Sequence, residues 1–347
     1  MTATDGRATL AAIAASAGVS VSTVSKVLNG RADVGPQTRA RVEALLAEYA
    51  YVGRRADGAT RAPRQQVVEL VFHGRLVGYA LEVLQGVLDA AAEAGVDVVV
   101  SRRPRRSGPG DESPTAWVRR LAAAGRTAVV DVVDDVLAGD LAALSRARLP
   151  LVVIDPMNLP QARTASVGAT NFAGGLAATQ HLLGLGHRRI AYLGGVAGSS
   201  VDQARMHGYL AAMSAQQAPV LEGYLRWGDF RYADGLREGG ALLDLPERPT
   251  AVFVASDESA AGLLEAARSR GLQLPQDLSV VGFDDTQVAR LTSPPLTTVR
   301  QPLREMGAVA LRTALRLGAG EKLDARHVEL ATELVVRGST APPPAQG

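Results

Sequence analysis

The stretch from Gly18 to Asn29 reads GVSVSTVSKVLN, and it decides how the rest of the sequence is interpreted. Before it, residues 9–17 (TLAAIAASA) place apolar side chains at the three- and four-residue spacing of a short helix. Thr9 suits the N-cap of that helix, because its hydroxyl can accept a bond from a backbone N–H of the first turn. Gly18 allows a sharp turn, since glycine adopts positive φ without a Cβ clash, and Ser20 can cap the next helix. The pattern predicts a helix-turn-helix.

The second predicted helix carries short hydroxyl side chains, one lysine and one amide on its outward side. The side chains that face the first helix are Val24, Val27 and Leu28. In a DNA-binding helix-turn-helix the second helix enters the major groove by its N-terminal residues, so Val21 and Ser22 are the leading base readers. Lys26 can reach guanine O6 and N7 or a phosphate. The predicted DNA contacts are Thr9, Ser20, Val21, Ser22, Thr23, Ser25, Lys26, Asn29, Thr38, Tyr51, Arg54 and Arg55. Taken alone, the stretch also fits an ordinary amphipathic hairpin with a solvated polar face.

Basic residues are concentrated at the N-terminal end. Residues 1–64 contain nine lysines and arginines against five acids, whereas the remainder of the chain contains 28 against 30. A basic unit on a slightly acidic body is typical of a nucleic-acid-binding head. The 347 residues suffice for two or three compact units, and the absence of cysteine excludes disulfides and thiolate metal sites. Because no signal peptide or membrane-length apolar run is visible, we expect a cytoplasmic protein.

A third helix and a linker complete the predicted head. Pro36 suits the first turn of a helix, where its missing N–H is not needed. The apolar stripe that packs over the first two helices consists of Val42, Leu45, Leu46 and Tyr49. We assign residues 1–54 to the head and residues 55–65 to a basic linker of small residues, which is either a flexible tether or a preformed helix.

From residue 66 onward, strand-like and helix-like segments alternate. Strands are predicted at 67–72, 96–100, 127–131, 151–155, 189–193, 251–254 and 279–283. Helices are predicted at 79–94, 115–124, 137–147, 172–185, 202–214 and 259–270. Such alternation predicts parallel sheets with helices on both faces. Since the second half repeats the architecture of the first, we expect a body of two doubly wound α/β lobes over residues 66–340. The proline-rich tail, 341–347, lacks heptads and is expected to be flexible.

Several carboxylates follow directly after predicted strands. They are Asp155, Asp257 and the pair Asp284-Asp285. In open α/β sheets, ligands collect at the carboxyl ends of the strands. Each carboxylate accepts two or more hydrogen bonds, so the group suits a ligand rich in hydroxyls. The alternative for each of these residues is a helix cap.

Four motifs in order carry a family resemblance over essentially the whole chain. They are the head stretch 9–29, HLLGLGHRRIA at 181–191, DLSVVGFDD at 277–285 and PPLTTV at 294–299. With these motifs the sequence resembles the LacI/GalR family of bacterial transcriptional regulators. The resemblance implies a periplasmic-binding-protein-like effector-binding and dimerisation domain after the head.

The resemblance also implies that the chain crosses three times between the lobes. The crossings are placed near Gly168, near Thr297–Gln301 and near Val328–Leu330. Lobe one then holds about 66–167 and 298–328, and lobe two holds about 168–297 and 329–340. The effector residues implied by the family motifs are Tyr79, Asp155, Arg205, Phe230, Asp257 and Asp284, with Leu76 as the alternative to Tyr79. Aromatic stacking together with carboxylates and a guanidinium suits a carbohydrate.

The linker departs from the family pattern. Family linkers usually form a hinge helix that inserts a leucine into the minor groove and kinks the duplex. Aligned from Tyr51, this sequence has Thr60 at the leucine position, and Asp57-Gly58 falls inside the expected helix. A glycine inside a helix costs roughly 1 kcal/mol.

These features predict a homodimeric repressor that binds a pseudo-palindromic operator and is released by a sugar between the lobes. No metal or other cofactor is implied. One alternative is a corepressor-dependent regulator that responds to a purine or a partner phosphoprotein. A sugar-processing enzyme is a further alternative, although the sequence has no Walker loop, Gly-x-Ser-x-Gly elbow or His-Glu-x-x-His motif. His181 and His187 lie in a helix-to-strand connection, where a structural role is expected.

Overall fold

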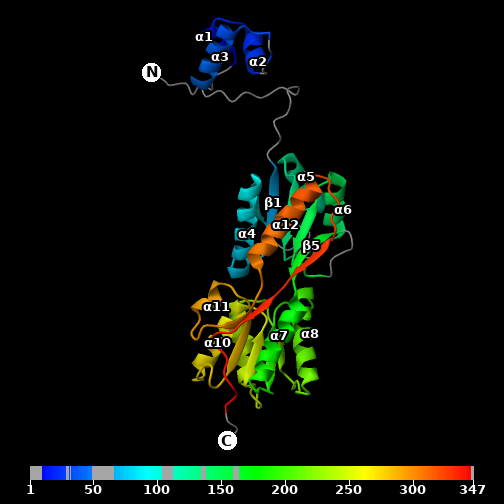
Figure 1. Ribbon diagram of the computed structural model, residues 1–347, viewed down its shortest axis with the longest axis vertical. Helices are drawn as coiled ribbons and strands as arrows, with labels where there is room; N and C mark the ends of the chain where they lie inside the picture. Colours follow the sequence, from blue (N-terminus) through cyan, green and yellow to red (C-terminus); the bar gives the residue numbers. More distant parts are fainter. Residues whose placement is uncertain are drawn as a thin grey trace. The chain divides into compact units, whose positions relative to one another are not determined.

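The computed structural model describes residues 10–28, 31, 33–48, 66–103, 112–133, 138–158 and 164–344, with the backbone alone at 47 and 48. The chain divides into two compact units, residues 1–65 and residues 66–347 (Figure 1). Within these ranges no single helix is long and apolar enough to cross a membrane. The predicted contacts Thr9, Asn29, Tyr51, Arg54 and Arg55, and the linker 55–65, lie outside the described residues.

The described part of the first unit contains three helices. They are α1 (Leu10–Ala17), α2 (Val21–Leu28) and α3 (Pro36–Glu48). The axes of α1 and α2 are bent by 103° across the turn, and Gly18 has φ +66° as the turn requires. The buried side chains of this unit are Ile13, Ala14, Ala17, Val24, Val27 and Val42. The predicted helix-turn-helix with a covering third helix is thus confirmed.

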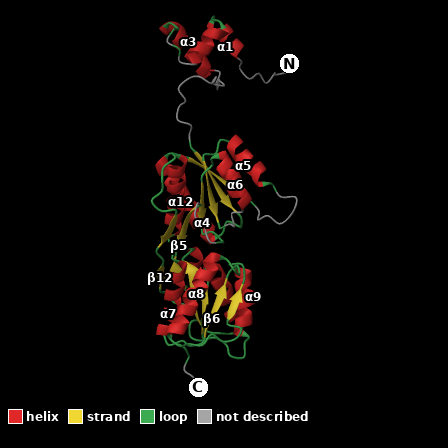
Figure 2. Ribbon diagram, turned by 90° about the vertical axis from the view of Figure 1, so that its right-hand side faces the viewer, coloured by secondary structure: helices red, strands yellow, loops and turns green. Residues whose placement is uncertain are grey.

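The second unit contains two six-stranded sheets. The first sheet is parallel throughout, in the order β11-β5-β4-β3-β1-β2. Its strands are β1 (Val67–Phe72), β2 (Asp97–Arg102), β3 (Ala128–Val132), β4 (Leu151–Ile154), β5 (Ala165–Ala169) and β11 (His327–Leu330). Its helices are α4 (Gly78–Ala94), α5 (Pro114–Ala123), α6 (Ala138–Ala147) and α12 (Leu303–Gly318). Helices α4 and α12 cover one face and α5 and α6 cover the other (Figure 2). We call this assembly lobe one.

The second sheet has the order β12-β10-β9-β8-β6-β7, and only β12 runs antiparallel to its neighbour. Its strands are β6 (Ile190–Gly194), β7 (Leu225–Trp227), β8 (Ala251–Val254), β9 (Ser279–Asp284), β10 (Thr297–Arg300) and β12 (Glu333–Val335). Its helices are α7 (Asn171–Gly184), α8 (Ser200–Ala215), α9 (Tyr232–Leu243), α10 (Asp257–Ser269) and α11 (Gln287–Leu291). This assembly is lobe two, and the predicted pair of doubly wound α/β lobes is confirmed.

The chain passes between the lobes after β5, after β10 and after β11. The structure assigns β10 (Thr297–Arg300) to lobe two, and β5 and β11 to lobe one through Ala169 and Leu330. The expected boundaries at 167, 297 and 328 therefore fall inside strands. The reason is that these strands continue through the edge of one lobe before the chain crosses, which hydrophobic pattern alone does not show.

Three helix pairs pack with their backbones in close approach through glycines. A Cβ atom at Gly175 in α7 would lie 2.2 Å from the carbonyl oxygen of Arg205 in α8, and one at Gly208 in α8 would lie 2.2 Å from that of Phe172. The same reciprocal arrangement joins α4 to α12 and α9 to α10 through Gly86, Gly307, Gly235 and Gly262. Because α7 and α8 touch in this way, the position of Arg205 depends directly on α7.

The C-terminal segment is packed against lobe two. His187 lies between the hydroxyls of Thr250, at 2.9 Å, and Ser279, at 3.0 Å, and its Nε2 is 2.9 Å from the Ala341 carbonyl oxygen. The Ala341 N–H donates to the Ser279 hydroxyl at 3.0 Å. His187 is buried, and these contacts agree with the structural role expected for it.

Candidate functional site

Most of the predicted DNA contacts that the structure describes lie on α2 or at its N-cap. Ser20, Val21, Ser22 and Lys26 are exposed, while Thr23 and Ser25 are half-buried. The Thr23 N–H donates to the Ser20 hydroxyl at 3.1 Å, so Ser20 caps α2. Val21 is 46% exposed, so its side chain is accessible at the start of α2, where a base reader is predicted. Thr38 is half-buried, one turn into α3.

On the lobe-one side of the predicted effector site, Tyr79 and Asp155 form one unit. The Tyr79 hydroxyl donates to Oδ2 of Asp155 at 2.6 Å. The other carboxylate oxygen, Oδ1, is buried and makes no well-formed hydrogen bond in the described part of the chain, although the Ala169 backbone N–H acts on this carboxylate and opposes the rise in its pKa that burial causes. Burial raises the pKa of Asp155, and burial together with the Asp155 charge raises the pKa of Tyr79 well above its ordinary value. Leu76, the alternative to Tyr79, lies elsewhere.

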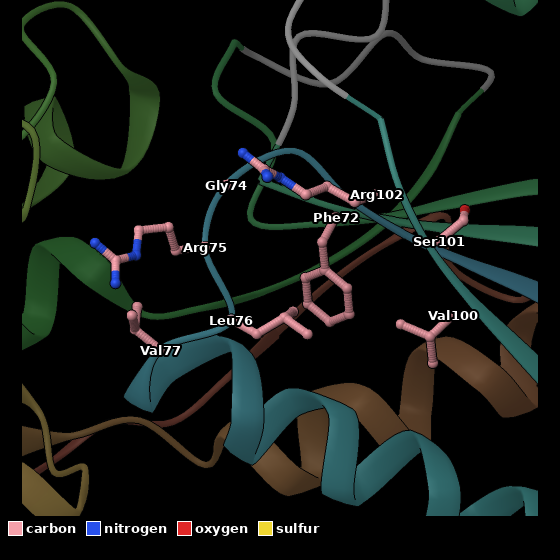
Figure 3. Close-up of a pocket in the computed structure, with 8 residues that line it drawn as sticks. All are labelled: Phe72, Gly74, Arg75, Leu76, Val77, Val100, Ser101 and Arg102. Carbon is pink, nitrogen blue, oxygen red and sulfur yellow. The ribbon is translucent and has the colours of Figure 1, made fainter.

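Leu76 lines a separate pocket of about 410 Å³ at the end of β1 and β2. Figure 3 shows Leu76, Phe72 and Val100 around this pocket, with Arg75 and Arg102 beside it. Apart from Leu76, none of the residues predicted to contact the effector lines it, so we distinguish it from the predicted effector site.

On the lobe-two side, Arg205 is held by two hydrogen bonds. Its Nε donates to Oδ1 of Asn171 at 2.8 Å, and Nη1 donates to the Ala255 carbonyl oxygen at 2.7 Å. The guanidinium lies 3.9 Å from the ring centre of Phe283 and 5.8 Å from that of Phe230. Arg205 is only 4% exposed, so the charge is held at a fixed position inside the protein.

Asp284, at the end of β9, faces Arg205 and a residue that the sequence did not indicate. Its Oδ1 is 3.9 Å from Nη1 of Arg205 and accepts a hydrogen bond from Nε2 of Gln301 at 2.6 Å. Burial raises the pKa of Asp284 to about 7. The second amide atom of Gln301, Oε1, is buried without a partner among the described residues. Gln301 occupies the crossing after β10, where no motif marks an amide as a ligand.

Phe230 is placed by the glycine-rich end of β6. A Cβ atom at Gly195 would lie 2.0 Å from the Phe230 ring, so only glycine allows the ring to lie there. The Asp202 carboxylate fixes this glycine by accepting its N–H at 2.8 Å and also accepts the Tyr192 hydroxyl at 2.7 Å. Asp202 therefore supports the position of the ring through Gly195.

Backbone strain is concentrated at the same positions. Seven non-glycine residues in the described ranges have positive φ, and Asp155, Phe230 and Asp284 are three of them, at +46°, +57° and +113°. Such conformations cost of order 1–3 kcal/mol each and persist where the surroundings determine them. Their coincidence with predicted ligand residues supports a binding role for this cluster.

Asp257 has a different role from the predicted one. Its Oδ2 accepts the backbone N–H of Thr286 at 2.7 Å and the Thr286 hydroxyl at 3.1 Å, and Oδ1 accepts the Thr298 hydroxyl at 2.6 Å. The residue is fully buried. Because these bonds satisfy both oxygens, Asp257 joins α10 to β10 beneath the site, and we remove it from the ligand contacts.

The two halves of the cluster face each other between the lobes. The charges of Asp284 and Arg205 both influence the pKa of Tyr79, although burial is the larger cause of its shift. The lobes also touch directly, since the Ser200 N–H of α8 donates to the Met157 carbonyl oxygen at 2.6 Å. No group of three metal-binding side chains occurs in the described ranges. The arrangement offers an aromatic face, one fixed guanidinium and several acceptors to a small polar molecule.

Comparison with known proteins identifies the family. Residues 9–53 match bacterial regulatory proteins of the lacI family, and residues 179–340 match the periplasmic binding protein-like domain. The chain is 31% identical to the HTH-type transcriptional regulator DegA of Bacillus subtilis, over 97% of this chain and 99% of DegA. Among solved structures, a complex of the regulator CelR with cellobiose has a TM-score of 0.71 at 32% identity, covering 96% of this chain and all of CelR. The Lac repressor dimer bound to operator and the anti-inducer ONPF has a TM-score of 0.76 at 28% identity, covering 97% and 100%. The chain belongs to the LacI family of bacterial regulatory proteins.

Proposed function

We propose that this regulator is a repressor that binds a pseudo-palindromic operator as a homodimer and is released by a sugar bound between its lobes. Binding to chromosomal DNA places it in the cytoplasm. The observation that carries the effector proposal is a pair of buried acceptors that make no well-formed hydrogen bond among the described residues, Oδ1 of Asp155 and Oε1 of Gln301. A buried acceptor left unpaired costs about 1–3 kcal/mol, so a ligand that donates to both atoms recovers that cost.

The chemistry around these acceptors favours a neutral polyhydroxylated ligand. Hydroxyl groups donate to the carboxylates of Asp155 and Asp284 and accept from the fixed guanidinium of Arg205. The Phe230 ring provides an apolar surface for the C–H face of a sugar ring. The cellobiose in the CelR complex and the operator in the Lac repressor complex support the same assignment here.

Release of DNA follows from the three crossings between the lobes. An effector that contacts Asp155 in lobe one and Asp284 in lobe two binds more tightly to one lobe arrangement than to another. The effector therefore shifts the protein toward the arrangement that it binds more tightly. The resulting change in DNA affinity cannot exceed the difference between the effector's affinities for the two arrangements.

A dimer requires an exposed apolar face on the second unit. Leu81 and Leu88 lie seven residues apart on α4 and are 50% and 41% exposed, and Val100 on the neighbouring edge strand β2 is 41% exposed. A two-fold dimer pairs this face with itself and presents two heads to two half-sites. We expect Leu88→Lys to shift the sedimentation coefficient of the full-length protein from dimer to monomer, whereas an unchanged dimer would place the interface elsewhere.

One observation favours the corepressor alternative. A carboxyl group with a pKa of about 7, as in Asp284, can donate or accept a hydrogen bond near neutral pH, which suits a nucleobase edge as well as a hydroxyl. A purine that tightens operator binding would establish this alternative.

The test uses full-length protein and a duplex recovered by selection from a randomised DNA library. Operator binding is measured by fluorescence anisotropy at fixed salt, with and without pentoses, hexoses, disaccharides and purines. We expect a sugar to weaken binding in the wild type, and Asp155→Asn to lose that response while Glu305→Gln, on the exposed face of α12, retains it. We also expect the bound sugar to be recovered unchanged, since chemical turnover would favour the enzyme alternative. Failure of every sugar to alter operator binding would contradict the effector proposal.

A further inference from the structure

The only charged residue of α2 is paired with an acid from the following loop. Nζ of Lys26, in the last turn of α2, donates to Oδ2 of Asp33 at 2.8 Å. Asp33 lies shortly before α3 begins at Pro36. The two side chains are 50% and 58% exposed, so the pair lies on the surface of the head. The lysine predicted to contact DNA is therefore already engaged in the protein without DNA.

The pair affects different DNA contacts in different ways. The hydrogen bond from Lys26 lowers the pKa of Asp33, so the acid is a carboxylate at neutral pH. A lysine ammonium has three donors, and one bond to Asp33 leaves two for the O6 and N7 acceptors of a guanine. Those base atoms carry only partial negative charge, so the carboxylate repels them less than it repels a phosphate. A phosphate bound to the same ammonium would bring a second negative charge close to Asp33.

We propose that Asp33 is a specificity-determining residue, which holds Lys26 for a guanine edge and opposes its use as a phosphate contact. The inference rests on the proposed binding of operator DNA. Asp33 thus acts as a positioning residue through Lys26, while the residues at the start of α2 remain the leading base readers. The inference also predicts a guanine in each half-site whose recognition depends on Lys26.

The expected effect can be estimated from counterion release. Each phosphate contact adds about 0.9 to the slope of log affinity against log salt. If Asp33→Asn frees Lys26 for one phosphate, affinity for a scrambled duplex rises roughly five- to tenfold near 0.1 M salt, and the slope steepens by about 0.9. Operator affinity changes by less than about threefold, because the guanine contact already uses Lys26. The ratio of operator to scrambled affinity therefore falls.

The experiment compares wild type, Asp33→Asn and the matched control Glu43→Gln in the full-length protein. Glu43 is an exposed acid on α3, so its substitution removes the same charge from the head without touching Lys26. Each protein is titrated with the selected operator and with a 30-base-pair scrambled duplex at several salt concentrations. The same pair of titrations is repeated with Lys26→Ala and with Lys26→Ala/Asp33→Asn. We expect Asp33→Asn alone to lower the ratio, and to have no effect where Lys26 is absent.

Four results would overturn the inference. An equal gain in affinity for the scrambled duplex with Glu43→Gln would show a general charge effect. So would a gain from Asp33→Asn that persists when Lys26 is absent. An unchanged ratio in Asp33→Asn, with wild type still selective for operator, would reject the role of Asp33 and leave the proposed function intact. Wild type that does not distinguish the duplexes would instead reject the proposed function, and this inference with it.

Discussion

The sharpest structural prediction concerns Gly175, where α7 meets α8. An alanine Cβ there would lie 2.2 Å from the Arg205 carbonyl oxygen, at least about 1 Å inside normal van der Waals contact. The neighbouring atom belongs to a helix backbone and cannot rotate away. The two helices must therefore separate, which stretches the 2.8 Å bond from Arg205 on α8 to Asn171 on α7.

Two opposing effects determine how much Gly175→Ala changes the free energy of unfolding. Alanine gains about 1 kcal/mol over glycine in a helix interior, whereas overpacking against a rigid neighbour costs about 3 kcal/mol. The net expectation for Gly175→Ala is a loss of about 2 kcal/mol in the free energy of unfolding, or roughly 4 °C in Tm. A shift of Arg205 by about 1 Å should lower the affinity for the effector 10- to 100-fold.

Gly184→Ala provides the matched control. Gly184 is the last residue of the same helix, is exposed, and has no atom within 4 Å of the position its Cβ would occupy. The same substitution there should raise the free energy of unfolding by about 0.5–1 kcal/mol and leave effector affinity unchanged. Urea unfolding followed by tryptophan fluorescence, and effector titration of the operator complex, measure both quantities. If the two variants agree within about 0.5 kcal/mol, the α7–α8 contact does not determine the position of Arg205 and the reasoning fails.

Three further predictions concern single side chains. The folded-state pKa of Asp284 is raised to about 7, so its protonated form stabilises the fold at low pH and that contribution is lost as pH rises through about 7. The free energy of unfolding should therefore fall between about pH 4 and pH 7 more in wild type than in Asp284→Asn, and parallel urea titrations would contradict this. Phe230→Ala should lower the affinity for the effector about tenfold and leave the affinity for the operator unchanged, as measured by anisotropy. An unchanged affinity for the effector would exclude ring stacking. His187→Ala leaves the Thr250 and Ser279 hydroxyls without their imidazole partner, and thermal unfolding should report a loss of about 2–4 kcal/mol with normal operator affinity.

The sequence predicted the head and the two lobes because their signals are local. The helix-turn-helix needs one glycine and a short run of apolar spacing, and each buried strand is a continuous apolar segment. Helix α9 gave no comparable signal, because YADGLREGGALL contains three glycines that disfavour a helix in isolation. It forms because Gly235 packs against the backbone of Ser259 in α10, a contact between distant segments.

Part of the candidate site was predicted because the end of a strand is also a local signal in the sequence. Strand-end position indicated both Asp155, after β4 of lobe one, and Asp284, at the end of β9 of lobe two. The two carboxyls interact across the lobes, since, in addition to burial, the Asp155 charge contributes to the raised pKa of Asp284. Strand-end position could not separate a ligand contact from a support, because the threonines that satisfy Asp257 are 29 and 41 residues away in the sequence. Gln301 was missed because an amide in a crossing segment becomes a candidate only when its buried, unpartnered oxygen is known.

Gln301 lies between the candidate effector site and the first helix that follows the crossing into lobe one. Its side chain donates to Asp284 and its backbone N–H donates to the Asp284 carbonyl oxygen, both in lobe two. Two residues later, Leu303 begins α12, whose buried side chains pack on lobe one together with those of β1. A ligand that rearranges the Asp284–Gln301 contact therefore acts on a short connection between the lobes, not on a distant surface. Because β1 is the first strand after residues 55–65, we expect the lobe arrangement that the proposed effector selects to determine the position at which β1 begins. The departure of Thr60 from the family's leucine does not affect this route, since it depends on where the linker starts and not on what the linker inserts into DNA.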